Sequence, residues 1–264
     1  MPNWVTNHLT ITGPNAEQVV IDITNEAGPG EIPSRELDFN KIIPMPESLK
    51  VPAGSITNAV ISAYLYKNKE LHTKKLETSL NNTQFFGRFD VREHDEDTYQ
   101  KLIENYCNKE KSEYSPSYTE EEFMELGKQL LDNLEQYGCL DWYGWSNANW
   151  GTKWNARTIL VENNIIIFET AWSDVRDLIC KLSEKYPENH FEYMWAEEQI
   201  GNYVGRATFH KGAEIEMIDY EDWSKEAYEQ AFDLVGGEDM FEFDEEMGTY
   251  KYIEEVQNED EGEM

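Results

Sequence analysis

The chain has 264 residues, enough for one large domain or two small ones, and its 39% hydrophobic content is too high for a disordered protein. Its 53 acidic side chains oppose 22 basic ones, and the resulting formal charge of −31 excludes a general affinity for nucleic acid or anionic membranes. Three widely spaced cysteines, no segment apolar enough to span a bilayer and no signal-peptide layout lead us to expect a cytoplasmic protein with reduced thiols.

The N-terminal segment predicts a strand followed by a helix. Residues 3–12 form the strand, because Leu9 and Ile11 alternate with threonines. The sequence GPN then breaks the strand and offers Asn15 as the N-cap of a helix over residues 16–27.

Residues 28–52 hold five of the nine prolines and predict a structured loop, because proline removes backbone donors. Two or three helices are predicted after this loop, with candidate ranges at residues 56–66, 97–108 and 119–137. The last of them opens with a capping box formed by Thr119 and Glu122, and Gly138 stands where its C-cap is expected.

The next segment predicts a hairpin, a helix and two further strands. Asn163 and Asn164 form the turn between strands over residues 152–162 and 164–172. The helix is expected between Ser173 as N-cap and Pro187 as terminator. The last two predicted strands cover residues 190–198 and 203–212.

This order of elements predicts an α+β fold with a ferredoxin-like (split βαβ) antiparallel sheet, a large helical insertion and an acidic C-terminal extension. The expected parts are a ferredoxin-like core, a loop and helical insertion, an acidic C-terminal region with aromatic residues, and a disordered tail. They cover, in that order, residues 1–27 with 151–212, residues 28–150, residues 213–256 and residues 257–264.

The opening MPNWVTNHLTITGP, the loop DFNKIIPMPESL, the motif NANWGTKWNA and the segment FETAW occur in an order that resembles the Api92-like family. That family is related to the plasmid-borne YubB ferredoxin-like domain. The resemblance covers residues 1 to about 210, and the region after Ile215 shows no counterpart. It implies a ferredoxin-like fold and an origin in phages or plasmids, and it carries over no catalytic residue.

The stretch WYGWSNANWGTKWNA concentrates four of the eight tryptophans. Its aromatic rings with Lys153 could stack bases or a sugar, but such a platform needs positive charge, which this chain lacks. We therefore interpret the stretch as a structural motif in which large indoles are buried and a glycine turns the chain. The motif consists of Trp142, Trp145, Trp150, Gly151 and Trp154.

The charge is uneven, because residues 213–264 hold 20 acidic side chains and two basic ones. Solubility alone is one explanation of such a charge. Aromatic residues interrupt the acids, however, and predict an ordered acidic surface. The candidate partner-binding residues are Asp219, Glu221, Asp222, Glu238, Asp239, Glu242, Asp244, Glu245 and Glu246.

These features predict a non-enzymatic protein of a phage or mobile element that inhibits a host nucleic-acid-targeting defence complex, of CRISPR or restriction type, through a DNA-mimicking surface. The expected partner is a basic nucleic-acid-binding nuclease complex of the host cell. Two alternatives remain: an interaction module with a conventional interface, and an enzyme acting on a nucleotide or small molecule. The five histidines are isolated and no catalytic motif is present, so neither metal nor cofactor is expected.

Overall fold

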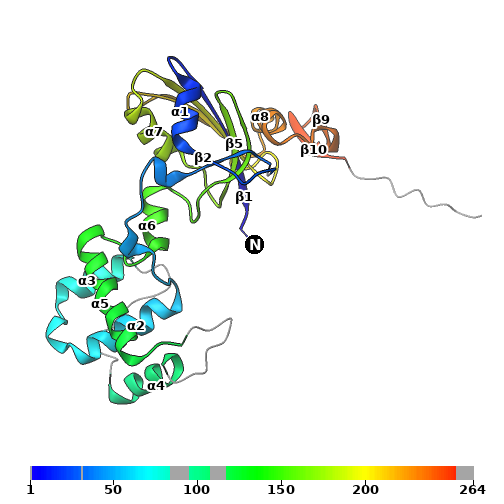
Figure 1. Ribbon diagram of the computed structural model, residues 1–264. Helices are drawn as coiled ribbons and strands as arrows, with labels where there is room; N and C mark the ends of the chain where they lie inside the picture. The colour runs from blue at the N-terminus through cyan, green and yellow to red at the C-terminus, as the bar shows by residue number, and fades with distance from the viewer. Residues whose placement is uncertain (1, 31, 84–94, 108–116, 254–264) are drawn as a thin grey trace, which may run out of the picture. The chain divides into compact units, whose positions relative to one another are not determined.

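The chain folds into two compact units, shown in Figure 1 as a computed structural model. The structure describes residues 2–30, 32–83, 95–107 and 117–253, so the predicted disordered tail lies outside the described residues. The sheet unit contains the described residues up to Ile43 and from Trp150 onward. The helical unit contains the described residues from Pro44 to Asn149. The insertion was expected to begin at residue 28. It begins later, because Phe39 is fully buried beside Phe168 of the sheet.

The sheet unit is built on an antiparallel sheet with the strand order β4-β5-β1-β6-β7-β8. Its strands are β1 (Trp4–Thr12), β4 (Arg157–Glu162), β5 (Ile165–Ala171), β6 (His190–Glu197), β7 (Gly205–His210) and β8 (Ala213–Asp219). Helix α1 (Ala16–Ile23) follows β1, and α7 (Arg176–Lys185) joins β5 to β6. The inner order β4-β5-β1-β6 with these two helices is ferredoxin-like, which confirms the predicted fold class.

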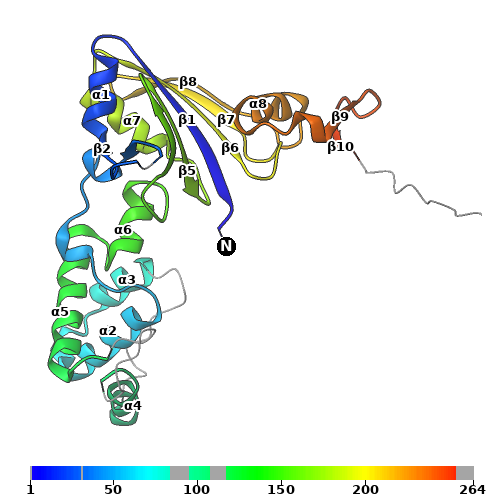
Figure 2. The same cartoon turned by 45° about the vertical axis from the view of Figure 1, so that its right-hand side comes forward.

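One face of this sheet carries the core of the unit. Val5, Leu9 and Ile11 of β1 are fully buried and alternate with half-buried residues of the other face. Helices α1 and α7 both lie on one side of the sheet in Figure 2 and bury their apolar stripes there. Each fully buried aliphatic side chain of this layer contributes about 1.5–3 kcal/mol.

The segment after α1 adds a small ladder beside the main sheet. Strands β2 (Thr24–Glu26) and β3 (Arg35–Leu37) pair antiparallel, and the backbone N–H of Leu37 donates to Thr158 Oγ1 of β4 at 2.8 Å. A 3₁₀ turn, η1 (Phe39–Lys41), follows, with Asp38 as its N-cap. These contacts are the reason that the segment belongs to the sheet unit rather than to the insertion.

Strand β8 extends the sheet past residue 212, where the ferredoxin-like core was expected to end. Lys211 and Gly212 both have positive φ and form the two-residue turn from β7 into β8. The register places Thr208 opposite Glu216 and Phe209 opposite Glu214, so Ile215 is an extra residue that makes a β-bulge. The first part of the acidic region is therefore an edge strand.

The two predicted helix N-caps have different outcomes. Asn15 occupies the N-cap position of α1, as predicted, but it adopts the left-handed conformation and its side chain makes no cap hydrogen bond. Helix α7 begins at Arg176 rather than after Ser173, whose hydroxyl donates instead to the Gly151 carbonyl at 2.5 Å. Asp174 accepts from the backbone N–H of Arg176 at 2.8 Å, so a carboxylate takes the place of the expected serine cap.

Within the described residues, the helical unit contains two helices that the sequence did not predict, over residues 74–83 and 142–149. Its helices are α2 (Ser55–Lys67), α3 (Lys74–Thr83), α4 (Glu96–Tyr106), α5 (Glu120–Tyr137) and α6 (Trp142–Asn149), with 3₁₀ turns η2 (Glu47–Leu49) and η3 (Lys69–Leu71). Helix α3 buries only one leucine, Leu80, and α6 has one glycine and two asparagines among its eight residues, which give it a weak apolar period. The predicted capping box of Thr119 and Glu122 and the left-handed Gly138 C-cap are both present on α5.

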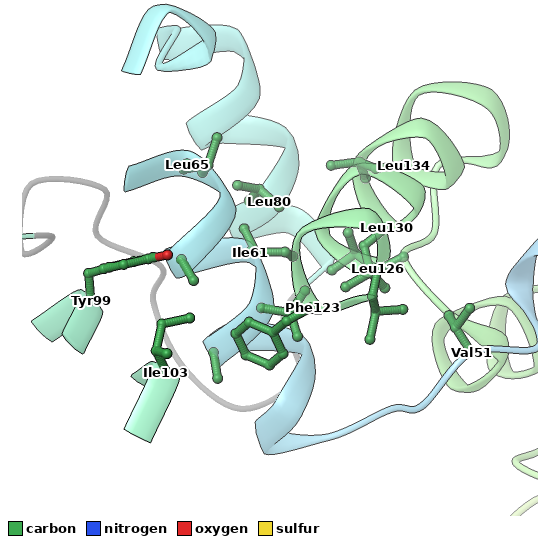
Figure 3. Packing of buried hydrophobic residues seen from close by; sticks show 14 residues of the cluster. Val51, Ile61, Leu65, Leu80, Tyr99, Ile103, Phe123, Leu126, Leu130 and Leu134 are labelled. Atoms are coloured by element: carbon green, nitrogen blue, oxygen red, sulfur yellow. The ribbon is translucent and has the colours of Figure 1, made fainter. Parts of the chain in front are cut away.

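Figure 3 shows how α2, α4 and α5 share one hydrophobic core, with Ile61, Leu65, Phe123 and Leu130 close together. Gly127 allows α2 and α5 to approach, because a Cβ at this position would lie 2.5 Å from the Cβ of Tyr64. Within the described parts of the chain, no helix has both the length and the apolar character needed to cross a bilayer.

Candidate partner-binding surface

The acidic C-terminal region is an ordered helix and hairpin: α8 (Lys225–Val235), a 3₁₀ turn η5 (Glu238–Met240), and strands β9 (Phe241–Asp244) and β10 (Thr249–Tyr252). The strands alternate, so that aromatic side chains share one face and charged side chains the other. The Phe241 ring lies 5.3 Å from that of Tyr228, and the Tyr250 ring lies 5.1 Å from that of Phe232. The aromatic face thus attaches the hairpin to α8.

Helix α8 is anchored to the sheet unit by small residues. Ala227 and Ala231 are fully buried and pack in a cluster with Ala196 and Val204. Ser224 begins the helix by accepting from the Ala227 backbone N–H at 3.1 Å. The opposite face of the helix is left to solvent and carries Glu226, Glu229 and Asp233.

The turn of the hairpin is organised by Asp244. Its carboxylate accepts the backbone N–H groups of Glu246 and Met247, at 2.9 and 3.1 Å. Lys251 lies across the hairpin and pairs with Asp244 at 3.1 Å and with Glu242 at 3.3 Å. These bonds, first the one from Met247 and then the one from Lys251, lower the pKa of the Asp244 carboxyl group.

The loop from β8 to α8 also uses two of the predicted carboxylates internally. Asp219 pairs with the Arg176 guanidinium at 3.0 Å. Asp222 accepts from the backbone N–H of Tyr203 at 3.0 Å, which ties this loop to the loop between β6 and β7. Both carboxylates therefore hold the surface in place while they remain exposed to solvent.

A side-chain bond joins the loop to the hairpin: Thr249 Oγ1 donates to the Trp223 carbonyl at 2.5 Å. The structure thereby brings all nine predicted carboxylates onto connected elements of one unit. Within the described residues, no internal hydrogen bond or ion pair involves the side chains of five of them. These five are Glu221, Glu238, Asp239, Glu245 and Glu246, and all five are exposed.

Three further acids on the exposed face of α8 were not among the predicted residues. They are Glu226, Glu229 and Asp233, and only Glu229 pairs with a cation, Lys225, at 3.6 Å. Their spacing of three and four residues is helical, so the periodicity of the sequence could have identified them. We define the acidic surface as these three residues together with the nine predicted ones.

The tryptophan motif is divided between the two units. Trp142 and Trp145 lie on α6 in the helical unit, where Trp145 is buried and Trp142 is half-buried against Tyr143. Asp141 precedes this helix and accepts the backbone N–H groups of Tyr143 and Gly144, both at 3.1 Å. Burial raises the pKa of the Asp141 carboxyl group.

The second half of the motif lies in the sheet unit. Trp150 is buried, its ring contacts Phe39 edge-on at 5.7 Å, and its Nε1 donates to the Ile43 carbonyl at 2.9 Å. Gly151 has a φ of 81°, a conformation that glycine adopts without strain. Trp154 remains half-exposed beside Trp4 at 6.3 Å. In this part of the motif, the Trp150 indole is part of the core, and the Trp154 indole stays accessible to solvent.

A polar network lies at the end of the sheet next to the β8–α8 loop. Arg176 pairs with the buried Asp174 at 2.8 Å and with Asp219, and its guanidinium lies 4.2 Å from the centroid of the Trp195 ring. Tyr203 donates to Asp174 at 2.7 Å. Burial, together with the Asp174 charge, raises the pKa of Tyr203 to about 12, so the phenol keeps its proton.

The described residues contain no group of three or more histidine, cysteine or acidic side chains that could hold a metal ion. A shallow hollow of about 610 Å³ is lined by β1, α1 and the turn between β4 and β5, with Glu17 and Gln18 at its polar side. No residue of the tryptophan motif lines this hollow.

Comparison with known proteins places the C-terminal part of the chain. Residues 149–261 match a family model described as the ferredoxin-like domain in Api92-like protein. The match continues past Ile215, where the sequence had shown no counterpart. A crystal structure of protein api92 from Yersinia pseudotuberculosis aligns at 11% identity, with a TM-score of 0.34, over 84% of this chain and 99% of that chain. No curated protein matches.

Proposed function

We propose, from the match of residues 149–261 to the ferredoxin-like domain of Api92-like proteins and from the acidic surface, that the chain inhibits a basic host protein without catalysis. The partner would be a nucleic-acid-targeting defence complex, of CRISPR or restriction type, in the cytoplasm of a bacterial host. The acidic surface would occupy the groove in which the complex binds DNA. The chain itself would be a protein of a phage or another mobile element.

One observation carries this proposal: unpaired carboxylates stand on elements whose positions are fixed by other bonds. Glu245 and Glu246 follow Asp244, whose carboxylate closes their turn. The hairpin in turn is attached to α8 by aromatic contacts. Because the hairpin that carries these carboxylates is already ordered, binding to a partner would not cost the entropy of ordering them, which favours affinity.

The spacing of acids on α8 also supports mimicry of a phosphate backbone. A helix rises about 1.5 Å per residue, so Glu226, Glu229 and Asp233 are separated by about 4.5 and 6 Å along its axis. Phosphates in one strand of B-DNA follow each other about every 3.4 Å along the helix axis. The carboxylate row is less dense than one DNA strand but similar in scale, which suits arginine and lysine side chains that line a DNA groove.

The proposal is tested by immobilising the purified chain and capturing proteins from a lysate of host cells at low and at high salt. The captured proteins are identified by mass spectrometry. We expect a nuclease complex to be retained at low salt and released at high salt, and its DNA cleavage to be inhibited by the pure chain. The double variant Glu245→Lys with Glu246→Lys should lose both effects, because it reverses two unpaired charges.

The matched control reverses two exposed acids of the same unit that lie outside the acidic surface, Glu162→Lys and Glu188→Lys. This control should retain the complex as the parent does. Retention that ignores salt, or a hairpin variant that inhibits as well as the parent, would contradict the proposal.

A further inference from the structure

Three loops at one end of the sheet each present an aromatic residue with a positive φ. We call this end the loop end and define it by residues 171–175, 197–204 and 219–224, which are the three loops with the last residue of the strand before each. Trp172, Tyr203 and Trp223 have φ values of 72°, 49° and 65°. Their exposed fractions are 58%, 37% and 42%. Bulky residues rarely adopt this conformation, and each of these three side chains still leaves more than a third of its surface to solvent.

Hydrogen bonds hold the three loops in contact with one another. Tyr203 N–H donates to Asp222 Oδ1 at 3.0 Å, and Trp223 N–H donates to the Gly201 carbonyl at 2.8 Å. The Tyr203 hydroxyl reaches Asp174, two residues after Trp172, at 2.7 Å. The three aromatic residues with positive φ therefore belong to loops that are joined to one another by hydrogen bonds.

The loop end carries an excess of negative charge, although Arg176, directly after the first loop, pairs with two of its carboxylates. Residues 171–175, 197–204 and 219–224 contain six carboxylates and neither lysine nor arginine. The carboxylates are Asp174, Glu197, Glu198, Asp219, Glu221 and Asp222. Aromatic faces surrounded by carboxylates attract cations, since the ring quadrupole and the carboxylate charge act in the same direction.

The molecule already contains one guanidinium bound in this manner. Arg176 lies 4.2 Å from the centroid of the Trp195 ring and pairs with Asp174 and Asp219. These partners line the same end of the sheet as the exposed rings. Arg176 thus shows that this end of the sheet can hold a planar cation between an indole ring and two carboxylates.

We propose that the loop end binds arginine side chains of the partner protein, with Trp172, Tyr203 and Trp223 as its contact residues. This inference rests on the proposed function, because it supposes that the acidic surface meets a basic protein. A second copy of the chain is a poor occupant, since each copy carries a net charge of −31 and the Arg176 guanidinium beside this end is already paired with Asp174 and Asp219.

The test uses a short fluorescein-labelled peptide of alternating arginine and glycine, with fluorescence anisotropy as the measurement at physiological salt. The same peptide with citrulline in place of arginine keeps the shape and removes the charge. We expect the arginine peptide to bind the full chain and the citrulline peptide not to bind. Trp172→Gly and Trp223→Gly should each raise the Kd about three- to fivefold, the size of an exposed cation–π contact.

Glycine is chosen because it relieves the positive φ while it removes the ring, so the Tm of Trp172→Gly should stay unchanged or rise as binding weakens. In Trp223→Gly the lost contact with Tyr228, at 6.3 Å, opposes this gain. Asn163→Gly is the matched control, because Asn163 also has a positive φ, of 52°, and lies in the turn at the opposite end of the sheet. This control should leave the Kd unchanged.

The inference is overturned if the parent does not bind the arginine peptide, or if both tryptophan variants bind as the parent does. A dimer of the parent that dissociates on Trp172→Gly would also overturn it, because the occupant would then be a second copy. Peptide binding that is lost with Glu245→Lys and Glu246→Lys, but not with the tryptophan variants, rejects the loop end and leaves the proposed function standing.

Discussion

At the scale of single residues, Gly205 on β7 is fixed by the indole that lies over it. A Cβ at this position would lie 2.1 Å from Cζ2 of Trp195 and 2.7 Å from the Ile218 carbonyl. Glycine is required here because the Trp195 ring lies so close to the backbone, and not because of the backbone conformation, since the φ of Gly205 is outside the left-handed region. The unusual feature of this residue is therefore its contact with a fully buried ring.

We predict that Gly205→Ala lowers the free energy of unfolding by about 1–3 kcal/mol, because the added methyl group must displace Trp195 or the backbone of β8. Chemical denaturation followed by tryptophan fluorescence measures this loss. Gly144→Ala is the contrasting variant, because its Cβ would meet only ordinary contacts at 3.8 Å and beyond within a helix. Equal stability of the two variants would contradict the role assigned to Trp195.

Asp141, at the start of α6, gives a prediction about pH. Burial raises the pKa of its carboxyl group, so the folded protein binds the proton more tightly than the unfolded chain does. The stability from this proton is fully present below the unfolded pKa and is lost as pH rises through the raised folded pKa. Compared with Asp141→Asn, which keeps a cap oxygen but cannot titrate, the parent should gain stability as pH falls from neutrality toward about 4.

The difference in unfolding free energy between the parent and Asp141→Asn, measured by denaturant titration at several pH values, follows this linkage. A difference that stays constant across that pH range would show that the carboxyl group titrates alike in both states. Thr57 makes the third bond to Asp141, from its Oγ1 to Oδ2 at 3.2 Å. Thr57→Val should therefore raise the carboxyl pKa further.

At the scale of elements, the β9–β10 hairpin depends on α8. The hairpin has four residues in each strand, too few for independent stability in water. Its attachment comes from rings, since Phe232 lies between Phe241, at 5.6 Å, and Tyr250, at 5.1 Å. Tyr228, one turn earlier on α8, contacts the same two rings at 5.3 and 5.7 Å, so Phe232 supplies about half of the aromatic attachment.

We predict that Phe232→Ala releases the hairpin while the main sheet stays folded. Amide hydrogen exchange should accelerate at residues 241–252 and stay slow in β1 and β6. Met247→Ala, in the exposed turn of the same hairpin, is the control and should leave the exchange pattern unchanged. Slow exchange throughout the hairpin in Phe232→Ala would mean that the Tyr228 contacts and strand pairing hold it without Phe232.

The elements that the sequence predicted well are those with strong local signals. The capping box of Thr119 and the turn at Asn163 each depend on side chains close in sequence, and both are present. Helix α6 lacked such a signal, because Gly144 and neighbouring asparagines give low helix propensity, and packing of Trp145 decides its formation. Strand β8 was missed because its outward charges concealed its pairing with β7.

The sequence could predict which region holds the candidate site, but not the contacts of its individual carboxylates. Acidic residues identify the region, but the sequence cannot show which carboxylates have internal partners. Asp219 is paired with Arg176, which is remote in the sequence, and Asp244 with Lys251, which requires the hairpin register. The loop end was not predictable, because Trp172 and Trp223 adopt a backbone conformation that their residue type disfavours.

At the scale of the whole molecule, the net charge of −31 opposes the folded state through self-repulsion. The described ion pairs are mostly exposed and each contributes little. Salt screens the repulsion over a distance of about 10 Å at 0.1 M and about 3 Å at 1 M. Stability should therefore depend on ionic strength more than it does in a protein of balanced charge.

We predict that sodium chloride raises the Tm, by about 2–4 °C for each kcal/mol of repulsion that is screened. Differential scanning fluorimetry across a salt series measures the shift, and an equal osmolality of an uncharged sugar is the control. The same salt should weaken binding of a basic partner, so stability and affinity should change in opposite directions. A Tm that falls with salt would mean that attractive ion pairs outweigh the repulsion.

The bulge at Ile215 has a consequence for the behaviour of this protein at high concentration. A sheet edge with free backbone groups can recruit a strand from another molecule and start a fibril. On β8, the extra residue interrupts the regular ladder, and Glu214 and Glu216 on either side of it would face like charges from an added copy. The outer strand of the sheet is therefore a poor template for amyloid growth, even though Ile215 and Met217 leave apolar surface on it.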